Sequence, residues 1–447
     1  MMLMNNKTRI LIIGASGKIG NELFHILKSK KYQSIFSVFG TYHSNKINHL
    51  DFLDLTNTEK IQQYLTKIEP DIIIDAAAIT YPPYCEENKQ LAYAVNTKSV
   101  FQMVEYSKKT NCKLVFISSD QVYSSKSSPI SETDLLEPLN YYSETKIESE
   151  NAVLILEQYL IIRTSWINDT RFNSKSFLTQ ILSSLKENKI FNARSDYFGH
   201  PSYSKNVAEI IIELILKNEI GIFNVSGSTY IDRYNFAKKI ANAFCLDPSL
   251  IREVSINDSK IQRPTKINLN LEKIKSKIST KLYTLDEQLE LMRSNYDFGI
   301  NIRDVKLVPL KSINDTRGSL SVLVSKDRNP IPHAEKIQEV YFTDIQNTNT
   351  IRANHKHKKI DEFFIMLNGS AKFILFDDRK DSSTFGNKFS IFLNGNFRCS
   401  LFVPAQIYHV FKTLEQKSQC LAIASNPYDV TEPDEVPAAE EMFSSDL

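Results

Sequence analysis

The chain has 447 residues, more than a single hydrophobic core usually holds, so two or three domains are expected. Its 54 lysines and arginines nearly balance its 52 aspartates and glutamates, which argues against a nucleic acid or an anionic membrane as a partner. Five scattered cysteines without a CxxC pair argue against a disulfide framework, and no apolar run approaches the roughly 20 residues of a membrane span, so we expect a cytoplasmic protein.

The first part of the chain, to about residue 170, alternates apolar runs with helical patterns. Continuous apolar strands separated by helices are typical of a parallel sheet covered on both faces. The runs are RILIIGA, SIFSVFGTY, DIIIDAAAI, KLVFISS and YLIIRTS. We therefore predict an α/β fold with a Rossmann-like, doubly wound parallel sheet.

A glycine-rich turn follows the first run and opens a helix. Its glycines let the backbone turn tightly and approach a pyrophosphate at the N-terminus of that helix. The second run ends without the acid that would bond the ribose 2′-hydroxyl of NADH, which favours NADPH, with His43 and Lys46 as phosphate partners. NADH stays the alternative. The predicted dinucleotide-binding residues are Gly14, Ser16, Gly17, Lys18, Ile19, Gly20, His43, Asp54 and Ala77, with Asp54 at the adenine edge.

The stretch FISSDQVYSSKSSPISETDLLEPLNYYSETK carries candidate catalytic groups. Ser118, Ser119 and Asp120 close an apolar run, and Tyr142 and Lys146 stand four residues apart at the expected start of a helix. Residues at this spacing share a helix face, so Lys146 is expected beside the Tyr142 phenol. A solvated helix face is the alternative interpretation.

Residues 171 to about 290 mix helical patterns, such as NVAEIIIELILK and YNFAKKIANAF, with short apolar runs. This mixture suits a smaller substrate-binding lobe on the carboxyl edge of the sheet. We assign residues 1–295 to the first domain, with the lobe at about 171–290, and residues 296–304 to a linker.

The motifs of the first domain resemble those of the extended short-chain dehydrogenase/reductase family. GxxGxxG, PDIIIDAAAIT, Val95-Asn96, SSD, YxxxK and IIRTSW occur in the family's order, and residues 8 to about 290 resemble dTDP-4-dehydrorhamnose reductases. The resemblance implies that Tyr142 protonates the substrate's carbonyl oxygen and that Ser119 hydrogen-bonds it. It also implies that Lys146 lowers the pKa of the phenol and that Tyr142 and Lys146 contact the nicotinamide ribose.

After residue 304 the pattern changes to short, alternating strands. KFILFDD, KFSIFL and SLFVPA are separated by turn residues, which predicts an all-β sandwich or barrel over residues 305–430. Residues 431–447 form an acidic, proline-containing tail that we expect to be poorly ordered.

A histidine cluster marks the β domain. His355, His357 and Glu362 follow the pattern HxHx4Ex6G, and His409 follows about fifty residues later. Residues two apart on a strand face the same way, so these four side chains can meet and hold Zn²⁺ or another divalent first-row metal. Both segments resemble the two motifs of cupins, which are jelly-roll domains.

Two cupin families imply different chemistry for His355. DTRGSL and NPYDVTEPDE resemble the dTDP-4-dehydrorhamnose 3,5-epimerases and related 3,4-ketoisomerases, in which the matching histidine is a base and no metal is used. NHKHKKIDEFFIMLNG resembles the zinc cupin of bifunctional capsular-polysaccharide reductases. One histidine cannot be a metal ligand and a free base at once. The epimerases also use a tyrosine as an acid, and the segment CLAIAS, where it is expected, contains no tyrosine. The candidates to replace it are Tyr341, Tyr408 and a metal-bound water.

These resemblances lead to one hypothesis and two rivals. The hypothesis is a bifunctional enzyme in which the cupin epimerises or isomerises beside the C4 ketone of a dTDP- or UDP-linked 4-keto-6-deoxyhexose, and the first domain reduces that ketone. One rival is a single-activity reductase whose cupin only binds sugar or dimerises. The other is a non-catalytic NADP-binding regulatory subunit. Both cupin resemblances imply a homodimer.

Overall fold

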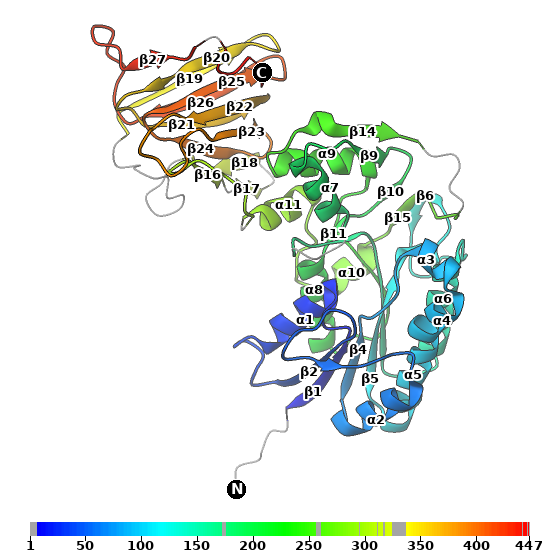
Figure 1. Cartoon of the computed structure of the whole chain (residues 1–447). Coiled ribbons are helices and arrows are strands. Elements are labelled where there is room, and N and C mark those ends of the chain that lie inside the picture. The colour runs from blue at the N-terminus through cyan, green and yellow to red at the C-terminus, as the bar shows by residue number, and fades with distance from the viewer. Residues whose placement is uncertain are drawn as a thin grey trace. The chain divides into compact units, whose positions relative to one another are not determined.

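The computed structural model divides the chain into two compact units (Figure 1). The structure describes residues 7–171, 176–255, 261–294, 296–310, 312–315, 318–323, 337–439, 441–444 and 446. Unit 1 comprises Met1–Gln180, Asn192–Phe236 and Glu253–Gln288, and unit 2 comprises Ile181–Phe191, Ala237–Arg252 and Leu289–Leu447.

Unit 1 is built on a seven-stranded sheet in which all neighbouring strands are parallel. The strand order is β12-β7-β5-β4-β1-β2-β3. The strands are β1 (Thr8–Ile13), β2 (Phe36–Tyr42), β3 (Asp51–Phe52), β4 (Ile72–Asp75), β5 (Lys113–Ser119), β7 (Tyr159–Thr164) and β12 (Gly221–Val225). From β1 the chain adds β2 and β3 on one side of the sheet, and from β4 onward it adds strands on the other side. Open α/β sheets bind ligands at such a change of direction, here beside β1 and β4.

Helices cover both faces of this sheet because successive residues of a buried strand point to opposite sides. Ile10 and Ile12 of β1 pack in one core cluster with α1 and α8, whereas Leu11 and Ile13 pack in another with α2 and α5. The predicted doubly wound sheet is thereby confirmed. The main helices are α1 (Lys18–Lys28), α2 (Thr58–Ile68), α5 (Ser99–Thr110), α6 (Tyr141–Val153) and α8 (Ser204–Leu216).

Shorter elements complete this part of the chain. The helices are α3 (Pro82–Glu87), α4 (Lys89–Tyr93), η1 (Ala94–Lys98), η2 (Asp120–Val122), α7 (Phe177–Lys186), α9 (Arg233–Ala243), η3 (Pro248–Leu250), α10 (Glu272–Lys277) and α11 (Leu285–Arg293). The strands are β6 (Lys126–Ile130), β8 (Ile167–Asn168), β9 (Phe191–Arg194), β10 (Phe198–Gly199), β11 (Ser202–Tyr203), β13 (Ile231–Asp232), β14 (Ile251–Val254) and β15 (Ile267–Leu269). They pair in twos, as β10-β13, β11-β8, β14-β9 and β15-β6.

A buried ion pair attaches helix α6 to the sheet. Arg163 of β7 lies with its Nη2 2.6 Å from Oε2 of Glu150 on α6, and the two side chains are 3% and 1% exposed. Arg163 also donates to the Tyr123 hydroxyl at 2.7 Å and to the Glu132 carbonyl at 2.9 Å. Buried charges are tolerated only when they are paired in this way.

Unit 2 contains two five-stranded antiparallel sheets and a hairpin. One sheet has the order β16-β24-β21-β26-β19 and the other β23-β22-β25-β20-β27. The strands are β16 (Lys306–Pro309), β19 (Glu339–Ile345), β20 (Ile351–His357), β21 (Glu362–Asn368), β22 (Ser370–Asp377), β23 (Lys388–Asn394), β24 (Cys399–Val403), β25 (Ile407–Thr413), β26 (Ser418–Ala424) and β27 (Glu435–Pro437), with β17 (Ser312–Asp315) and β18 (Gly318–Ser321) in the hairpin. Phe364, Phe373 and Phe411 pack in the core of this unit. The predicted all-β domain is confirmed, although Thr316 and Arg317 of DTRGSL lie outside the described residues.

The C-terminal tail differs from our expectation. Its residues Glu435–Pro437 form β27, which pairs with β20, and Phe443 is 2% exposed among Ile374, Tyr408 and Val410. The prediction of a poorly ordered tail is therefore wrong for the described part of the tail. The acidic composition was misleading, because strand pairing by β27 and the burial of Phe443 against β22 and β25 hold the tail.

Two segments of the predicted lobe belong to unit 2 rather than to unit 1. After α9, Cys245 places its sulfur 3.5 Å from that of Cys399 on β24, and its carbonyl accepts from the Phe392 amide at 3.2 Å. Asn394 donates to the Asn242 carbonyl at 2.8 Å. The end of α9 thus packs as part of the β unit.

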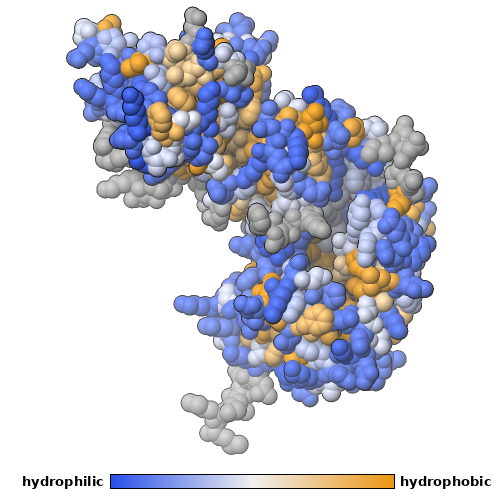
Figure 2. Space-filling view, in the orientation of Figure 1, coloured by the Kyte–Doolittle hydropathy of each residue, from blue (hydrophilic) through white to orange (hydrophobic). Residues whose placement is uncertain are grey.

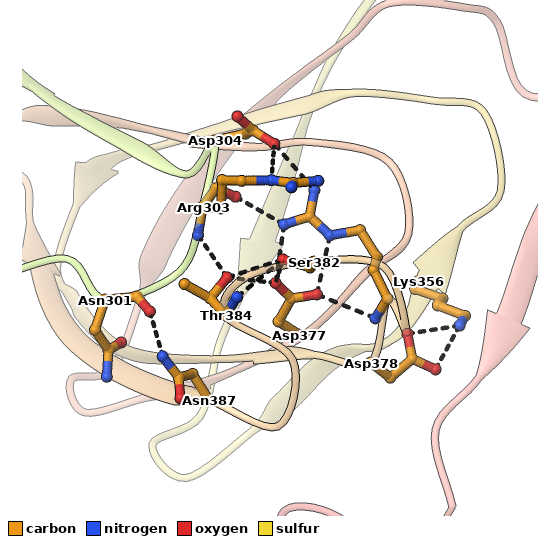
Figure 3. Close-up of polar contacts among 10 residues, drawn as sticks. Asn301, Arg303, Asp304, Lys356, Asp377, Asp378, Ser382, Thr384 and Asn387 are labelled. Carbon is orange, nitrogen blue, oxygen red and sulfur yellow. Dashed lines mark hydrogen bonds and ion pairs between the residues drawn. The ribbon is translucent and has the colours of Figure 1, made fainter.

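A polar network joins the segment before β16 to the turn after β22 (Figure 3). Arg379 donates to the Asp377 carboxylate at 2.9 Å and to the Arg303 carbonyl at 2.8 Å, and its Nη1 lies 3.2 Å from Asp304. Thr384 donates to the same Asp377 carboxylate at 2.6 Å. The predicted linker region is thereby fastened to the β unit.

The outer surface is mixed in character. Figure 2 shows a face on which hydrophilic residues predominate, with smaller hydrophobic patches between them. Within the described parts of the chain, no helix combines the length and the apolar character required to cross a membrane.

Replacing Arg163 tests the buried ion pair. Arg163→Leu leaves the Glu150 carboxylate buried without its partner, so we expect a loss of about 3–5 kcal/mol in the free energy of unfolding of unit 1. Urea denaturation followed by circular dichroism measures it. The control is Lys109→Ala, which breaks an exposed ion pair with Glu105. The side chains of Lys109 and Glu105 are 70% and 52% exposed. We expect less than about 1 kcal/mol there, and equal losses for both variants would contradict the assignment.

Candidate functional sites

A cavity of about 400 Å³ lies at the carboxyl ends of β1, β2 and β4. Six of the residues predicted to bind a dinucleotide line it, namely Gly14, Ser16, Gly17, His43, Asp54 and Ala77. Lys18, Ile19 and Gly20 are not among its lining residues. Lys18 donates to the Ile167 carbonyl at 3.4 Å, and Ile19 is buried in the core.

Two glycines of the turn are required by its geometry. Gly14 has φ +77°, and a Cβ there would lie 2.9 Å from Ala77. A Cβ on Gly20 would lie 2.3 Å from the Gly14 carbonyl oxygen. Gly17 precedes α1 without a side-chain cap, which leaves amides of the first turn available to an anionic acceptor. The turn and cavity therefore fit a dinucleotide pyrophosphate.

The far side of the cavity carries His43 and Asp54. The His43 Nδ1 lies 3.0 Å from the Ser44 hydroxyl. Hydrogen bonds from the Thr56 amide and hydroxyl, at 2.9 and 2.7 Å, lower the pKa of Asp54. Asp54 is therefore an ionised acceptor, suited to a hydroxyl or an amino group.

The structure brings Ser119 and Tyr142 together. Ser119 ends β5, and Tyr142 is the second residue of α6, whose N-terminus is capped by Asn140 through a 3.0 Å bond from the Ser143 amide. Burial raises the pKa of the Tyr142 phenol, and the hydrogen bond with Ser119 opposes that shift. The net shift is upward, whereas the resemblance implies a lowering by Lys146. The phenol is accordingly a proton donor at neutral pH.

Lys146 lies one turn further along α6 and is 2% exposed. Its Nζ donates to the Ile117 carbonyl at 2.9 Å and lies 4.4 Å from the centre of the Phe116 ring. Burial lowers its pKa to about 8, against the charge of Asp75, which acts to raise it. Burial in turn raises the pKa of Asp75 to about 6.

Two buried polar residues near this group escaped the sequence analysis as site residues. Asp75 ends β4 as the acid in the apolar run DIIIDAAAI, a signal that could have identified it. Asn96 lies in the π-helical turn η1 and is 1% exposed. Its side chain exchanges hydrogen bonds with the amide and carbonyl of Ile79, at 2.8 and 3.0 Å, and donates to Thr145 at 3.2 Å. Asn96 thus links the loop after β4 to helix α6.

Arg233, which sequence reasoning also missed, lies among aromatic rings of the lobe. Its guanidinium carbon is 3.6 Å from the centre of the Trp166 ring and 4.3 Å from that of Phe177. Burial lowers its pKa to about 10, while Tyr197 and Asp120 act to raise it. The lobe therefore contains a cation supported by ring faces.

In unit 2, three strands bring the predicted cluster together. His355 and His357 come from β20, Glu362 begins β21 and His409 comes from β25. The Glu362 Oε2 lies 3.0 Å from the His409 Nε2 and 3.3 Å from the His357 Nε2. The His355 ring centre lies 4.8 Å from that of His357 and 4.9 Å from that of His409. All four predicted residues therefore meet.

The unsatisfied atoms of this cluster fit a divalent cation. The His409 Nδ1 lies 3.2 Å from the Ile407 carbonyl oxygen and its Nε2 lies 3.0 Å from the Glu362 Oε2. With the proton on Nδ1, the Nε2 lone pair is directed into the cluster. His355 Nε2, Glu362 Oε2 and His409 Nε2 are buried without a well-aligned hydrogen-bond partner among the described residues. Burial and the neighbouring histidines lower the pKa of His355 to about 4. Neutral imidazoles and a carboxylate are the donors that Zn²⁺ takes.

A second cavity, of about 310 Å³, opens beside the cluster and is lined by His357, Glu362, Tyr341 and Glu435 among others. The Tyr341 hydroxyl donates to the Glu362 Oε1 at 3.0 Å. Tyr408 lies in another core cluster, beneath the amine of Lys356. Of the two tyrosines considered as acids, only Tyr341 lines this cavity.

Comparison with known proteins identifies relatives of both units. Residues 8–298 match the family described as "RmlD substrate binding domain", and residues 303–435 match the one described as "WxcM-like, C-terminal". The dTDP-4-dehydrorhamnose reductase of Aggregatibacter actinomycetemcomitans is 29% identical over 283 residues, which cover 60% of this chain and 92% of the relative. Methionine adenosyltransferase 2 subunit beta of Xenopus tropicalis is 26% identical over 255 residues, which cover 55% and 75%.

A solved structure shares the fold of the first part. The crystal structure of dTDP-4-dehydrorhamnose reductase from Bacillus anthracis in complex with NADP is 26% identical and matches with a TM-score of 0.58. It covers 64% of this chain and 99% of that one. Since the first family match spans residues 8–298, well over half of the chain, the protein belongs to the RmlD substrate binding domain family and carries a WxcM-like cupin domain behind it.

Proposed function

We propose that the protein is a bifunctional enzyme of nucleotide-deoxysugar biosynthesis. Unit 1 reduces the C4 ketone of an NDP-4-keto-6-deoxyhexose, and unit 2 first inverts or shifts a centre beside that ketone. The observation that carries the proposal is the buried group of Ser119, Tyr142 and Lys146, whose Tyr142 belongs to a cluster packed against Ile79, a residue that lines the cavity of about 400 Å³. Both units then use one property of the substrate, because a ketone accepts hydride and also acidifies its neighbouring C–H bonds.

The reductase chemistry follows from the protonation of three side chains. NADPH, when bound, supplies the hydride to C4. Tyr142 gives its phenolic proton to the developing alkoxide, and Ser119 donates a hydrogen bond to the same oxygen. Lys146, whose amine donates to the Ile117 carbonyl, would contact the nicotinamide ribose and compensate the charge left on the phenol.

The end of β2 favours NADPH over NADH. His43, Ser44 and Asn45 line the cavity there, and none of them is an acid that would repel a 2′-phosphate. The relative from Bacillus anthracis was solved in complex with NADP. Both observations support NADPH as the cofactor.

The cupin acts as an epimerase or isomerase by proton transfer. A neutral His355 takes a proton from the carbon next to the ketone, and Tyr341, which lines the cavity beside the cluster, returns one. His355 itself is not among the residues that line this cavity. In the alternative arrangement His355, His357, Glu362 and His409 hold Zn²⁺, which when bound acts as a Lewis acid beside the ketone. The unsatisfied inward atoms of the cluster support this second arrangement.

A cytoplasmic homodimer completes the proposal. All five cysteines are free thiols, as a reducing compartment requires. β19 lies at the edge of its sheet in the described part of unit 2, and its Val340 and Phe342 are 58% and 59% exposed. Exposed apolar side chains on an edge strand favour pairing with a second copy.

A second candidate function rests on one relative. The similarity to methionine adenosyltransferase 2 subunit beta, which is named as one subunit of an enzyme, favours a non-catalytic subunit. The buried Ser119, Tyr142 and Lys146 favour catalysis instead. Replacing Tyr142 separates the two functions.

Tyr142→Phe removes the proposed proton donor. We expect the rate of NADPH oxidation with a dTDP-linked 4-keto-6-deoxyhexose to fall by about 10²-fold or more, with NADPH affinity nearly unchanged. Absorbance and cofactor fluorescence measure the two quantities. Tyr141→Phe, one residue earlier on the same helix, is the control and should keep its activity. An active Tyr142→Phe variant would remove the reductase mechanism, and no turnover by the wild type with dTDP- or UDP-linked substrates would favour the regulatory subunit.

Reaction in D₂O tests the cupin. We expect the wild type to form a reduced sugar that carries solvent deuterium on the carbon beside C4, as detected by mass spectrometry. His355→Gln should form the reduced sugar without that deuterium, whereas His25→Gln, on α1, should match the wild type. Deuterium-free product from the wild type would limit the protein to reduction.

Metal analysis distinguishes the two cupin mechanisms. If the cluster holds zinc, the purified wild type should contain about one zinc ion per chain by elemental analysis, and His409→Ala should contain almost none. Removal by a chelator should then abolish deuterium incorporation while ketone reduction continues. Full deuterium incorporation by the metal-free protein would leave His355 as a metal-independent base.

A further inference from the structure

The three histidines of the cluster, His355, His357 and His409, all direct the Nδ1 atom of the ring away from the centre of the cluster. The Nδ1 of His409 lies 3.2 Å from the Ile407 carbonyl oxygen, that of His357 lies 3.6 Å from the Asp434 Oδ2, and that of His355 lies 3.8 Å from the Glu435 Oε2. Each Nδ1 therefore faces an acceptor oxygen, and the His357 Nδ1 is buried without a hydrogen-bond partner among the described residues. Two of the three oxygens belong to the C-terminal tail.

The tail is held where these acids face the histidines. β27 pairs with β20 in an antiparallel register that sets Glu435 opposite His357 and Pro437 opposite His355. Asp434 accepts from the amides of Lys359 and Ile360 at 3.0 and 3.1 Å, both to Oδ2. The oxygen that faces His357 is thus fixed by the backbone rather than free to rotate away.

Anchors further along the tail keep the strand in this register. Ala438 donates its amide to the Asn354 carbonyl at 2.9 Å, and the Phe443 side chain is buried at 2% exposure. The Lys388 amine lies 2.7 Å from the Asp446 carboxylate. The acids are therefore part of an ordered structure that extends on both sides of β27.

We infer that the C-terminal strand selects the tautomers of the cupin histidines. Asp434 and Glu435 keep the proton of His357 and His355 on Nδ1, so that both Nε2 lone pairs face the centre together with Glu362 and His409. Metal-ligating histidines depend on such partners for orientation and basicity. At 3.6 and 3.8 Å, a shift of less than about 1 Å makes the hydrogen bond. The inference rests on the proposed function of unit 2.

Glu435 is a positioning residue in either cupin mechanism, and Asp434 is one in the metal mechanism. A metal needs the Nε2 lone pairs of both histidines, and a metal-free reaction needs that of His355 as the base. Metal affinity is the sharper readout, since it does not require the substrate. Loss of such an outer partner typically weakens metal binding by about 10–100-fold.

The test compares Zn²⁺ affinity across matched variants of the full chain, by competition with a chromogenic chelator. Asp434→Asn and Glu435→Gln keep the size of each side chain and remove its charge, and Asn retains an acceptor for the two amides. We expect each variant to bind Zn²⁺ about 10-fold or more weakly and the double variant more weakly still, with Asp434→Glu closer to the wild type. Glu432→Gln, an exposed acid of the same tail, is the control and should bind as the wild type does.

The outcomes separate this inference from the proposed function. Unchanged Zn²⁺ affinity in both acid variants, with thermal unfolding like that of the wild type, overturns the inference and leaves the cupin mechanism standing. If the wild type binds no Zn²⁺, deuterium incorporation becomes the readout, and Glu435→Gln and the double variant should slow it by about 10-fold. The inference is overturned if these variants incorporate deuterium at the wild-type rate. It is also overturned if the wild type neither binds Zn²⁺ nor incorporates deuterium.

Discussion

The ion pair between Arg163 and Glu150 is the interaction on which the site of unit 1 depends. Both charges are almost fully buried, and they connect strand β7 to helix α6 at 2.6 Å. Burial of charge is costly, so the pair is stable only while helix and sheet keep one spacing. Tyr142 and Lys146 lie earlier on that helix, and their distance from Ser119 on β5 follows from it.

Desolvation then gives the functional side chains their protonation states in both units. It raises the pKa of Tyr142, lowers that of Lys146 to about 8 and lowers that of His355 to about 4. Each shift favours the neutral form of the side chain, because a low dielectric disfavours the charged form. Unit 1 therefore offers a neutral proton donor beside a cation, and unit 2 offers a neutral imidazole beside the carboxylate of Glu362.

Much of the fold and part of the site could be predicted from the sequence. The difference between the features that could be predicted and those that could not has physical causes. Apolar runs separated by helical periods predicted the parallel sheet, since period and length differ between buried strands and helices. The HxH spacing predicted that His355 and His357 face one point, because strands alternate. Lys18, Ile19 and Gly20 were also expected to contact the cofactor, but they do not line the cavity, because a motif names a turn and not the direction of each side chain in it.

The sequence by itself determined the two kinds of unit and the glycine turn, in which the structure gives Gly14 a φ of +77°. It also determined the candidate residues Ser119, Tyr142, His355 and Glu362, because all of these depend on local spacing. Only the tertiary structure decided that the acidic tail becomes a strand, with Glu435 opposite His357, and that the end of α9 packs with the β unit. Such contacts join residues far apart in the chain. Their energy comes from burying apolar surface and pairing strand edges, and neither quantity can be read from composition.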